Sequence, residues 1–146
     1  MRKVLALIAH DSKKDDMVRL VKAYQKELAG IEIVATRSTG QFVQGRTGLT
    51  VKLLQRGALG GDQQIGSLVA NDEVRAVIFL REPLMAQPHD PEVSALLRVC
   101  DVHNVPIATN IGTAEAVLAL IVKHHEAADK TCLAAQFIEG MTSLDR

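Results

Sequence analysis

The chain has 146 residues, a length suited to one domain with a hydrophobic core of its own. Lys and Arg together number 17 and Asp and Glu together number 17, so the formal net charge is zero. A neutral chain with 3% aromatic residues lacks the basic surface and the stacking rings of nucleic-acid-binding proteins, and it lacks the basic patch of a membrane-surface protein. We therefore expect neither a nucleic-acid nor a membrane partner.

The location of the protein is predicted from its apolar runs and its cysteines. No apolar run approaches the length of a membrane-spanning helix, and the first run, which ends at His10, is too short for a signal peptide. Cys100 and Cys132 lie in apolar stretches and lack the spacing of metal ligands. We interpret both as reduced core thiols and expect a cytoplasmic protein without a disulfide or a bound metal.

Five apolar runs of strand length predict five β-strands, at residues 4–9, 31–35, 49–54, 74–80 and 105–108. The runs are continuous, and this pattern is typical of parallel strands that are covered on both faces. The run at 74–80 is the most apolar, so we expect it at the centre of the sheet.

Helices are expected in the segments that separate and follow these runs. The periodicity predicts a helix through residues 17–24, a short helical segment at 41–45, and helices over about 62–69, from 90 onward and over about 112–124. The helix from residue 90 has a typical start, with Asp90 as N-cap, Pro91 at the first helical position and Glu92 in the first turn. Residues 126–146 are expected to form a short helix and a loose end.

Strands that alternate with helices predict one α/β domain over residues 1–146, with a doubly wound, mainly parallel five-stranded sheet and helices on both faces. Ligands bind beyond the carboxyl ends of the strands in such sheets. Polar residues or glycines follow every predicted strand, namely His10 and Asp11, residues 36–40, residues 57–62, Arg81 and Glu82, and Thr109 and Asn110. We therefore expect one ligand site at this edge of the sheet.

The turn after the third predicted strand contains Gly57, Gly60 and Gly61, which permit a tight turn and close backbone approach to a ligand. Amides at the start of the next helix favour an anion, phosphate above all. Asp62 adds a carboxylate at this helix start. Helix capping is the commoner role of such a residue, but the polar residues at the other strand ends favour a functional one.

The predicted site combines carboxylates, imidazoles and cations, namely Asp11, Asp62, Glu82, Asp90 and Glu92, His10 and His89, and Lys13 and Lys14. The chain has no Gly-x-Ser-x-Gly motif and no Walker lysine motif, so covalent hydrolysis and nucleotide triphosphate cleavage are disfavoured. The hydroxyl groups at 36–39 favour phosphate over a metal. A carboxylate opposite an imidazole suits proton abstraction beside a carbonyl, because the imidazole can polarise the oxygen.

Each of these residues also has a purely structural explanation. His10 fits a satisfied histidine at a strand end as well as it fits a functional one. Asp11 and Asp90 have the pattern of ordinary N-caps, and Glu92 has the position of a residue that complements the helix dipole.

Four motifs, in this order, resemble the methylglyoxal synthase family: Ala9-His10-Asp11 with Lys14, Gly60-Gly61-Asp62-Gln63-Gln64, Pro83-Leu84 with Gln87-Pro88-His89-Asp90-Pro91, and Pro106-Ile107-Ala108-Thr109-Asn110. The similarity extends from residue 4 to about residue 118. The Gly-Gly-Asp and Pro-His-acid-Pro motifs are specific in combination, whereas either alone is a weak signal.

The resemblance implies a flavodoxin-like three-layer sandwich and a lyase that converts dihydroxyacetone phosphate to methylglyoxal and inorganic phosphate through an enediolate. It also implies an enzyme without a cofactor, a homohexamer and a bypass of glycolysis. The same domain type serves as a regulatory module in carbamoyl phosphate synthetase, so a non-catalytic phospho-ligand-binding module is the alternative. A relative that acts on another small phosphorylated ketose is a third interpretation.

The resemblance also implies roles for individual residues. Asp62 matches the aspartate that takes the substrate proton, and His89 matches the histidine that polarises the carbonyl. Asp11 matches a further essential carboxylate, and His10 and Lys14 match residues near the substrate and its phosphate. The remaining matches are two glutamates where the family usually has aspartate, Glu82 and Glu92, and the phosphate-binding residues Thr36, Arg37, Ser38, Thr39, Gly40, Arg56 and Gly57.

Two arginines depart from the family pattern in the predicted phosphate site. The family usually has glycine at the position of Arg37 and serine at the position of Arg56. A guanidinium there can bind the phosphate through two parallel hydrogen bonds, or it can block the site to the substrate. The sequence does not distinguish these alternatives.

Overall fold

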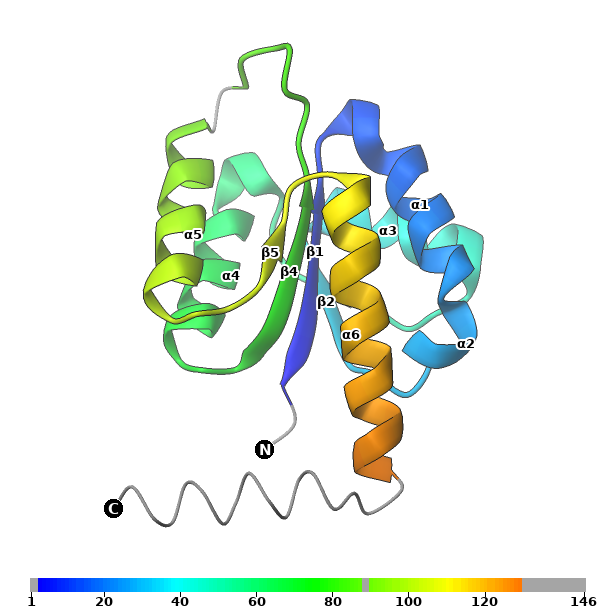
Figure 1. The fold of residues 1–146 in the computed structure, drawn as a ribbon. Coiled ribbons are helices and arrows are strands. Elements are labelled where there is room, and N and C mark those ends of the chain that lie inside the picture. The colour runs from blue at the N-terminus through cyan, green and yellow to red at the C-terminus, as the bar shows by residue number, and fades with distance from the viewer. Residues whose placement is uncertain (1–2, 88–89, 130–146) are drawn as a thin grey trace, which may run out of the picture.

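The computed structural model describes residues 3–87 and 90–129 and contains a five-stranded sheet (Figure 1). The strands are β1 (Val4–Ala9), β2 (Ile33–Ala35), β3 (Lys52–Leu53), β4 (Val74–Leu80) and β5 (Ile107–Ala108), in the spatial order β3-β2-β1-β4-β5. Every neighbouring pair is parallel, with Leu7 of β1 opposite Ala35 and Ile78 on its two sides. The predicted α/β class with a parallel sheet is therefore confirmed.

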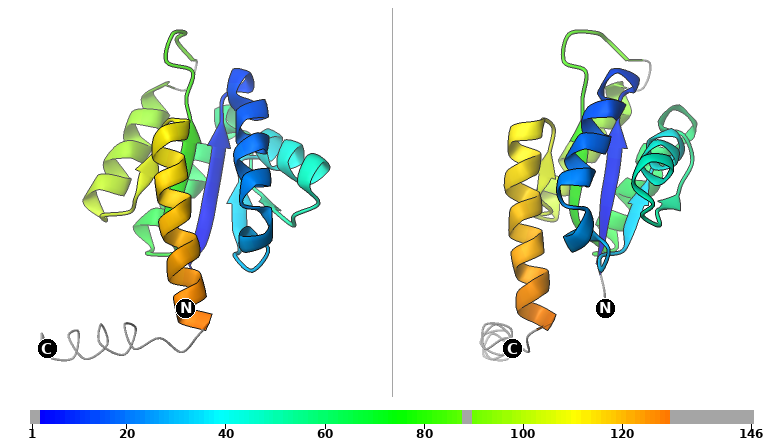
Figure 2. Two further views of the ribbon diagram at one scale, coloured as in Figure 1. Left: turned by 45° about the vertical axis from the view of Figure 1, so that its right-hand side comes forward. Right: turned by 90° about the vertical axis from the view of Figure 1, so that its right-hand side faces the viewer.

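Helices cover both faces of the sheet and make the three-layer sandwich (Figure 1 and Figure 2). One face carries α1 (Lys14–Ala23), α2 (Gln25–Leu28), α3 (Arg37–Thr47) and α6 (Ile111–Asp129), and the other carries α4 (Gly61–Ala70) and α5 (Asp90–Val102). Two short 3₁₀ turns, η1 (Asp11–Lys13) and η2 (Gly57–Leu59), precede α1 and α4. Each helix of the described residues is too short or too polar to span a bilayer.

The central strand β1 contributes to a hydrophobic core on each side of the sheet. Leu5 and Leu7 pack with the helices of the α1 face, whereas Ala6 and Ile8 pack with α4 and α5. All six residues of β1 are buried. A strand that is covered on both faces has no exposed side for polar residues, which explains the continuous apolar run in the sequence.

The chain reverses its direction across the sheet between β1 and β4. Strands β1, β2 and β3 follow one another toward one edge, and the chain then returns to the far side of β1 to form β4. The helices change face at the same step. Such a switch point leaves a crevice beyond the carboxyl ends of the two strands, and the segments that begin at His10 and Arg81 border it.

Several local predictions differ from the structure, among them the end of the last predicted helix at about residue 124, because α6 continues to Asp129. The third strand is two residues long instead of 49–54, because it lies at the sheet edge and pairs with β2 alone, while Val51 is buried without strand pairing. The short helical segment predicted at 41–45 is longer, because α3 begins at Arg37 and ends at Thr47, so most of the polar segment 36–40 lies in its first turn. Strand β4 lies inside the sheet, but the central position belongs to β1.

Other local predictions are confirmed. Helix α5 begins close to the predicted start, but Asp90 is its first helical residue and not the N-cap, and its carboxylate accepts the backbone N–H of Gln87, which precedes the helix, at 3.0 Å. Cys100 is a buried free thiol, and burial, with a smaller contribution from the charge of Asp101, raises its pKa to about 11. Cys132 and the predicted elements of the tail after residue 129 lie outside the described residues.

Candidate active site

His10 follows β1 directly and is fixed on three sides. Its backbone N–H donates to the carbonyl oxygen of Leu80 at 3.1 Å, and its ring packs edge-on against Phe79 with centroids 5.2 Å apart. Its Nδ1 accepts the backbone N–H of Glu82 at 2.8 Å. Because Nδ1 accepts this hydrogen bond, the neutral imidazole carries its proton on Nε2 and presents that N–H as a donor.

Glu82 lies two residues beyond the end of β4 and has both carboxylate oxygens occupied. One accepts the backbone N–H of Leu84 at 3.0 Å, and the other accepts the hydroxyl of Ser12 at 2.8 Å. The hydrogen bonds from Leu84 and then Ser12, with smaller contributions from Lys13 and His10, lower the pKa of Glu82 below its ordinary value. The carboxylate is therefore ionised at neutral pH, which favours a role in holding the loop over one as a proton donor.

Lys14 is the buried cation of the site. Its ammonium group donates to the carbonyl oxygen of Ala9 at 3.4 Å and forms an ion pair with the carboxylate of Asp11. The side chain of Asp11 is exposed, whereas that of Lys14 is buried in the first turn of α1. The pair therefore places a positive charge at the bottom of the crevice, with the matching carboxylate at its surface.

Two threonine hydroxyls join α3 to the end of β1. Thr39 Oγ1 accepts the backbone N–H of Ala9 at 3.1 Å, and Thr36 Oγ1 donates to Thr39 Oγ1 at 3.2 Å. Both side chains are buried. These contacts bring the first turn of α3, with Ser38, against the end of the central strand.

The glycine turn before α4 has the conformation that its sequence predicts. Gly60 has φ +106°, a region that other residues rarely adopt, and Gly61 touches the backbone of the preceding segment. A Cβ on Gly61 would lie 2.2 Å from the carbonyl oxygen of Gln55. This close approach places Asp62, which is 1% exposed, in the first turn of α4 beneath the site.

The turn yields a stability prediction. Gly61→Ala should destabilise the protein by roughly 1 to 3 kcal/mol, because the added methyl group meets backbone atoms that cannot rotate away. The matched control is Gly66→Ala in the same helix, where a Cβ meets nothing within 4 Å and the better helix former should add up to about 1 kcal/mol. Denaturant unfolding measures both changes. An unfolding midpoint of Gly61→Ala equal to that of the wild type would contradict the close approach.

A cavity of about 290 Å³ lies beyond the ends of β1, β2 and β3, and we call it the first cavity. Seven predicted site residues line it: His10, Asp11, Lys14, Thr36, Ser38, Arg56 and Gly57. Six others do not line it: Arg37, Thr39, Gly40, Asp62, Glu82 and Glu92. The last predicted residue, His89, lies outside the described residues. The first cavity therefore combines two cations with hydroxyl groups, which suits a phosphate group.

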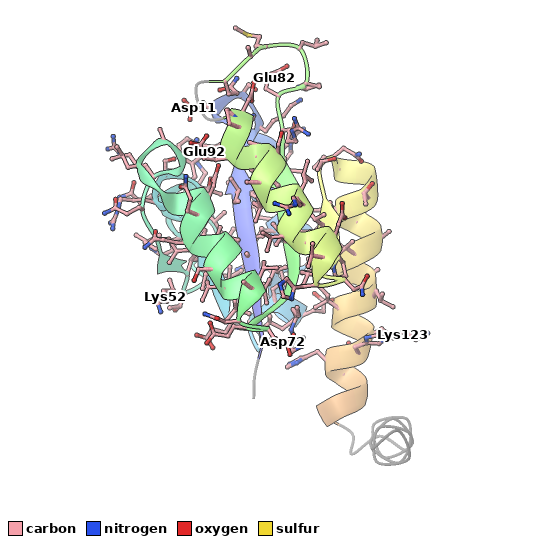
Figure 3. All side chains as sticks on the ribbon, turned by 90° about the vertical axis from the view of Figure 1, so that its left-hand side faces the viewer. Asp11, Lys52, Asp72, Glu82, Glu92 and Lys123 are labelled. Carbon is pink, nitrogen blue, oxygen red and sulfur yellow. The ribbon has the colours of Figure 1, made fainter. Side chains whose placement is uncertain are left out.

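The carboxylates of the predicted site come from different elements of the chain but share one end of the molecule. Figure 3 shows Asp11, Glu82 and Glu92 at the end where β1 and β4 finish. Helices α4 and α5 pack together and carry Asp62 and Glu92 in their first turns. One oxygen of Glu92, Oε2, is buried and has no hydrogen-bond partner within residues 3–87 and 90–129. No group of three potential metal ligands occurs in the same residues.

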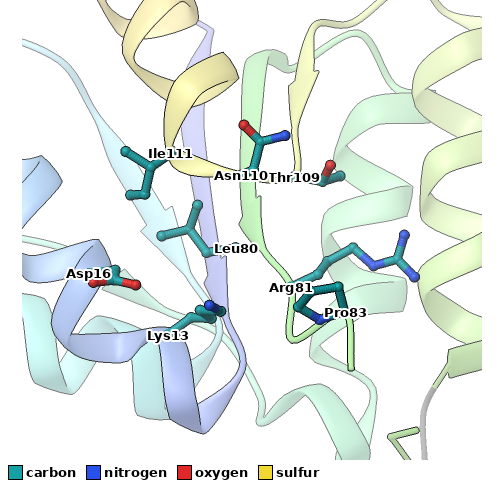
Figure 4. A pocket seen from close by; sticks show the side chains of 8 residues that line it. All are labelled: Lys13, Asp16, Leu80, Arg81, Pro83, Thr109, Asn110 and Ile111. Atoms are coloured by element: carbon teal, nitrogen blue, oxygen red, sulfur yellow. The ribbon is translucent and has the colours of Figure 1, made fainter. Parts of the chain in front are cut away.

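The ends of β4 and β5 border a second cavity of about 370 Å³ (Figure 4). Arg81, Thr109 and Asn110 line this second cavity and not the first one, so the five strand ends do not form the single site that the sequence predicts. Lys13 also lines it, and the side chain of Arg81 extends away from Lys13 (Figure 4). The segment from Asp11 to Lys14 therefore borders both cavities, since Asp11 and Lys14 line the first and Lys13 lines the second.

The sequence analysis assigned no role to two residues of the site region, Gln87 and Ser12. Gln87 lines the first cavity and stands in the quoted Gln-Pro-His motif, so the motif itself was the available signal. Ser12 contacts Glu82 over 70 positions of sequence, and no local pattern indicates such a contact.

Comparison with known proteins identifies the family. The sequence model of the MGS-like domain matches residues 16–109. The methylglyoxal synthase of Carboxydothermus hydrogenoformans is 58% identical over 114 residues, which cover 78% of this chain and 94% of that protein. The chain belongs to the methylglyoxal synthase family. The methylglyoxal synthase of Moorella thermoacetica, another member, is 55% identical over 120 residues, which cover 82% of this chain and 94% of that protein.

A solved structure agrees with this assignment. The crystal structure of methylglyoxal synthase from Elizabethkingia anophelis matches with a TM-score of 0.75 and 44% sequence identity, over 80% of this chain and 77% of that one. The resemblance to the methylglyoxal synthase family that the sequence motifs indicate is therefore confirmed at the level of both sequence and fold.

Proposed function

We propose that the protein is a methylglyoxal synthase, a lyase that converts dihydroxyacetone phosphate to methylglyoxal and inorganic phosphate without a cofactor. The single observation that supports this proposal most strongly is the first cavity, which brings Lys14, Arg56 and the donor His10 together beyond the ends of β1, β2 and β3. The names and high identity of the family members support the same activity.

The phosphate group of the substrate would bind in the first cavity. Lys14 supplies a buried positive charge, Arg56 supplies a guanidinium, and Ser38 supplies a hydroxyl at the start of α3. Gly57 lies at the start of η2, where no side chain prevents backbone approach. These groups can hold the leaving phosphate in place while its bond to carbon breaks.

The proton transfer would use Asp62 as the base. Its carboxylate takes a proton from the hydroxymethyl carbon of the substrate, and the electrons left behind form an enediolate. A proton then moves from the terminal hydroxyl to the former carbonyl oxygen. The terminal oxyanion re-forms a C=O bond while the C–O bond of the ester carbon breaks, which releases phosphate and leaves the enol of methylglyoxal. This enol gains a proton on carbon and becomes the product. Glu92 and Asp11 complete the proposed set of carboxylates.

Two histidines would stabilise the negative charge that develops on the substrate oxygens. His89 is proposed to polarise the carbonyl group, and His10 offers Nε2–H as a neutral donor because Glu82 occupies its Nδ1. A neutral imidazole suits this task, since it donates a hydrogen bond to the developing enediolate without protonating the intermediate prematurely.

The remaining parts of the proposal concern the cellular setting. We propose a cytoplasmic enzyme that bypasses the later steps of glycolysis and works as a homohexamer. The loop after β4 supports a subunit contact, because Leu84 and Met85 expose 89% and 70% of their surface in the single chain.

A non-catalytic phospho-ligand-binding module is the second candidate function. Arg56 favours it, because its guanidinium lines the first cavity and can occupy space that the substrate needs. The two candidates differ in one assay: purified protein is incubated with dihydroxyacetone phosphate, and methylglyoxal and phosphate are measured together. Equal amounts of both products support the enzyme. Tight phosphate binding without any product supports the module, and turnover of a different phosphorylated ketose supports the third interpretation.

Asp62→Asn tests the proposed base. The amide keeps the size of the side chain but cannot accept the substrate proton, so kcat should fall by about 100-fold to 10,000-fold while phosphate affinity stays within a factor of about two. Asp101→Asn, at an exposed site in α5, is the matched control and should retain full activity. Near-normal turnover by Asp62→Asn would remove Asp62 from the role of base.

Arg56 and Arg37 form a matched pair for the phosphate site. Arg56→Ser should raise KM by about 10-fold to 100-fold, because a charge-assisted hydrogen bond to phosphate is lost. Arg37→Ala should leave KM nearly unchanged, since Arg37 does not line the first cavity. Steady-state kinetics measure both values. Higher activity in Arg56→Ser than in the wild type would mean that Arg56 blocks the site.

A further inference from the structure

The contact between Ser12 and Glu82 joins the segments that leave the two strands at the switch point. Ser12 lies in η1, directly after β1, and Glu82 lies in the loop after β4. The strands themselves are paired up to Ala9 and Leu80, where the ladder stops. Beyond that point β1 continues into η1 and α1, whereas β4 continues into an extended loop (Figure 1).

The loop after β4 has little packing of its own to fix its position. Pro83, Leu84 and Met85 are all exposed, so hydrophobic burial does not hold this segment against the domain. The backbone N–H of Arg81, the first loop residue, donates to the carbonyl oxygen of Thr109 at 3.4 Å. The next contacts run through Glu82: the Ser12 hydroxyl and the Leu84 N–H reach the carboxylate, and the backbone N–H reaches His10.

The geometry links Ser12 to the ring of His10 through one residue. When the Ser12 hydroxyl holds the Glu82 carboxylate at 2.8 Å, the backbone N–H of Glu82 stays 2.8 Å from His10 Nδ1. This N–H keeps the imidazole proton on Nε2 and prevents rotation of the ring. Without the hydroxyl, the loop can move away, and His10 can then take the other tautomer, in which Nε2 no longer donates.

We propose that Ser12 is a positioning residue of this active site, which fixes the tautomer and orientation of His10 through Glu82. The proposal rests on the proposed lyase function only for its effect on turnover, because the state of His10 is observable without substrate. Ser12 does not line the first cavity, so its effect should appear in kcat and not in the affinity for the phosphate group. Removal of a residue that orients a functional histidine from outside the site typically lowers activity by about 10-fold to 100-fold.

The test compares Ser12→Ala with Ser12→Thr, which keeps the hydroxyl, and with Ser94→Ala, an exposed serine of α5 that serves as the matched control. Nitrogen NMR of the histidine rings reports the tautomer of each ring, and His10→Gln assigns the signal. We expect the wild type, Ser12→Thr and Ser94→Ala to carry the His10 proton on Nε2. Ser12→Ala should show a mixture of tautomers, with kcat reduced by about 10-fold and KM changed by less than about 2-fold.

The two parts of the experiment separate the proposal from the function on which it rests. A His10 spectrum and a kcat in Ser12→Ala that both equal the wild-type ones would overturn the positioning role, as would a failure of Ser12→Thr to restore the Nε2 tautomer. If the wild type does not turn over dihydroxyacetone phosphate, the lyase function fails, and the NMR comparison alone then decides the role of Ser12.

Discussion

The parallel pairing of β1 with β4 is the interaction on which the rest of the structure depends. It joins the two halves of the domain, and each strand is buried by helices on both faces. Because the pairing is parallel, both strands end at the same edge, and the chain direction reverses between them. The polar groups that follow, from His10 on one strand to Glu82 on the other, are therefore brought within hydrogen-bond distance although they lie far apart in the sequence.

The site places polar groups where burial makes them costly. His10, Lys14 and Asp62 are 5%, 6% and 1% exposed, and buried charges destabilise a protein unless partners compensate them. Lys14 is compensated by Asp11 and a backbone carbonyl, and His10 by the backbone N–H of Glu82. A core that served stability alone would use apolar residues at these positions, so their burial supports the roles in binding and proton transfer that we propose for them.

The sequence predicted those features that arise from local patterns. The run at 4–9 predicted a strand buried on both faces, and the glycines before Asp62 predicted the tight turn in which Gly60 has φ +106°. The close approach that Gly61 makes is to the backbone of Gln55, whereas the predicted approach to a ligand stays a prediction. Features that depend on distant partners escaped prediction. The third strand was predicted too long, because only two of its residues find pairing partners in β2. Arg37 and Arg56 seemed equivalent in the sequence, but the fold places only Arg56 in the first cavity. The Ser12 contact has no local signal at all.

A crystal structure of the protein with bound inorganic phosphate tests most directly whether the first cavity holds the phosphate group of the substrate. We expect the ion in the first cavity, with its oxygens roughly 2.7 to 3.2 Å from Lys14 Nζ, the Ser38 hydroxyl and the Arg56 guanidinium. Phosphate bound only in the second cavity, beside Lys13 and Asn110, would contradict it.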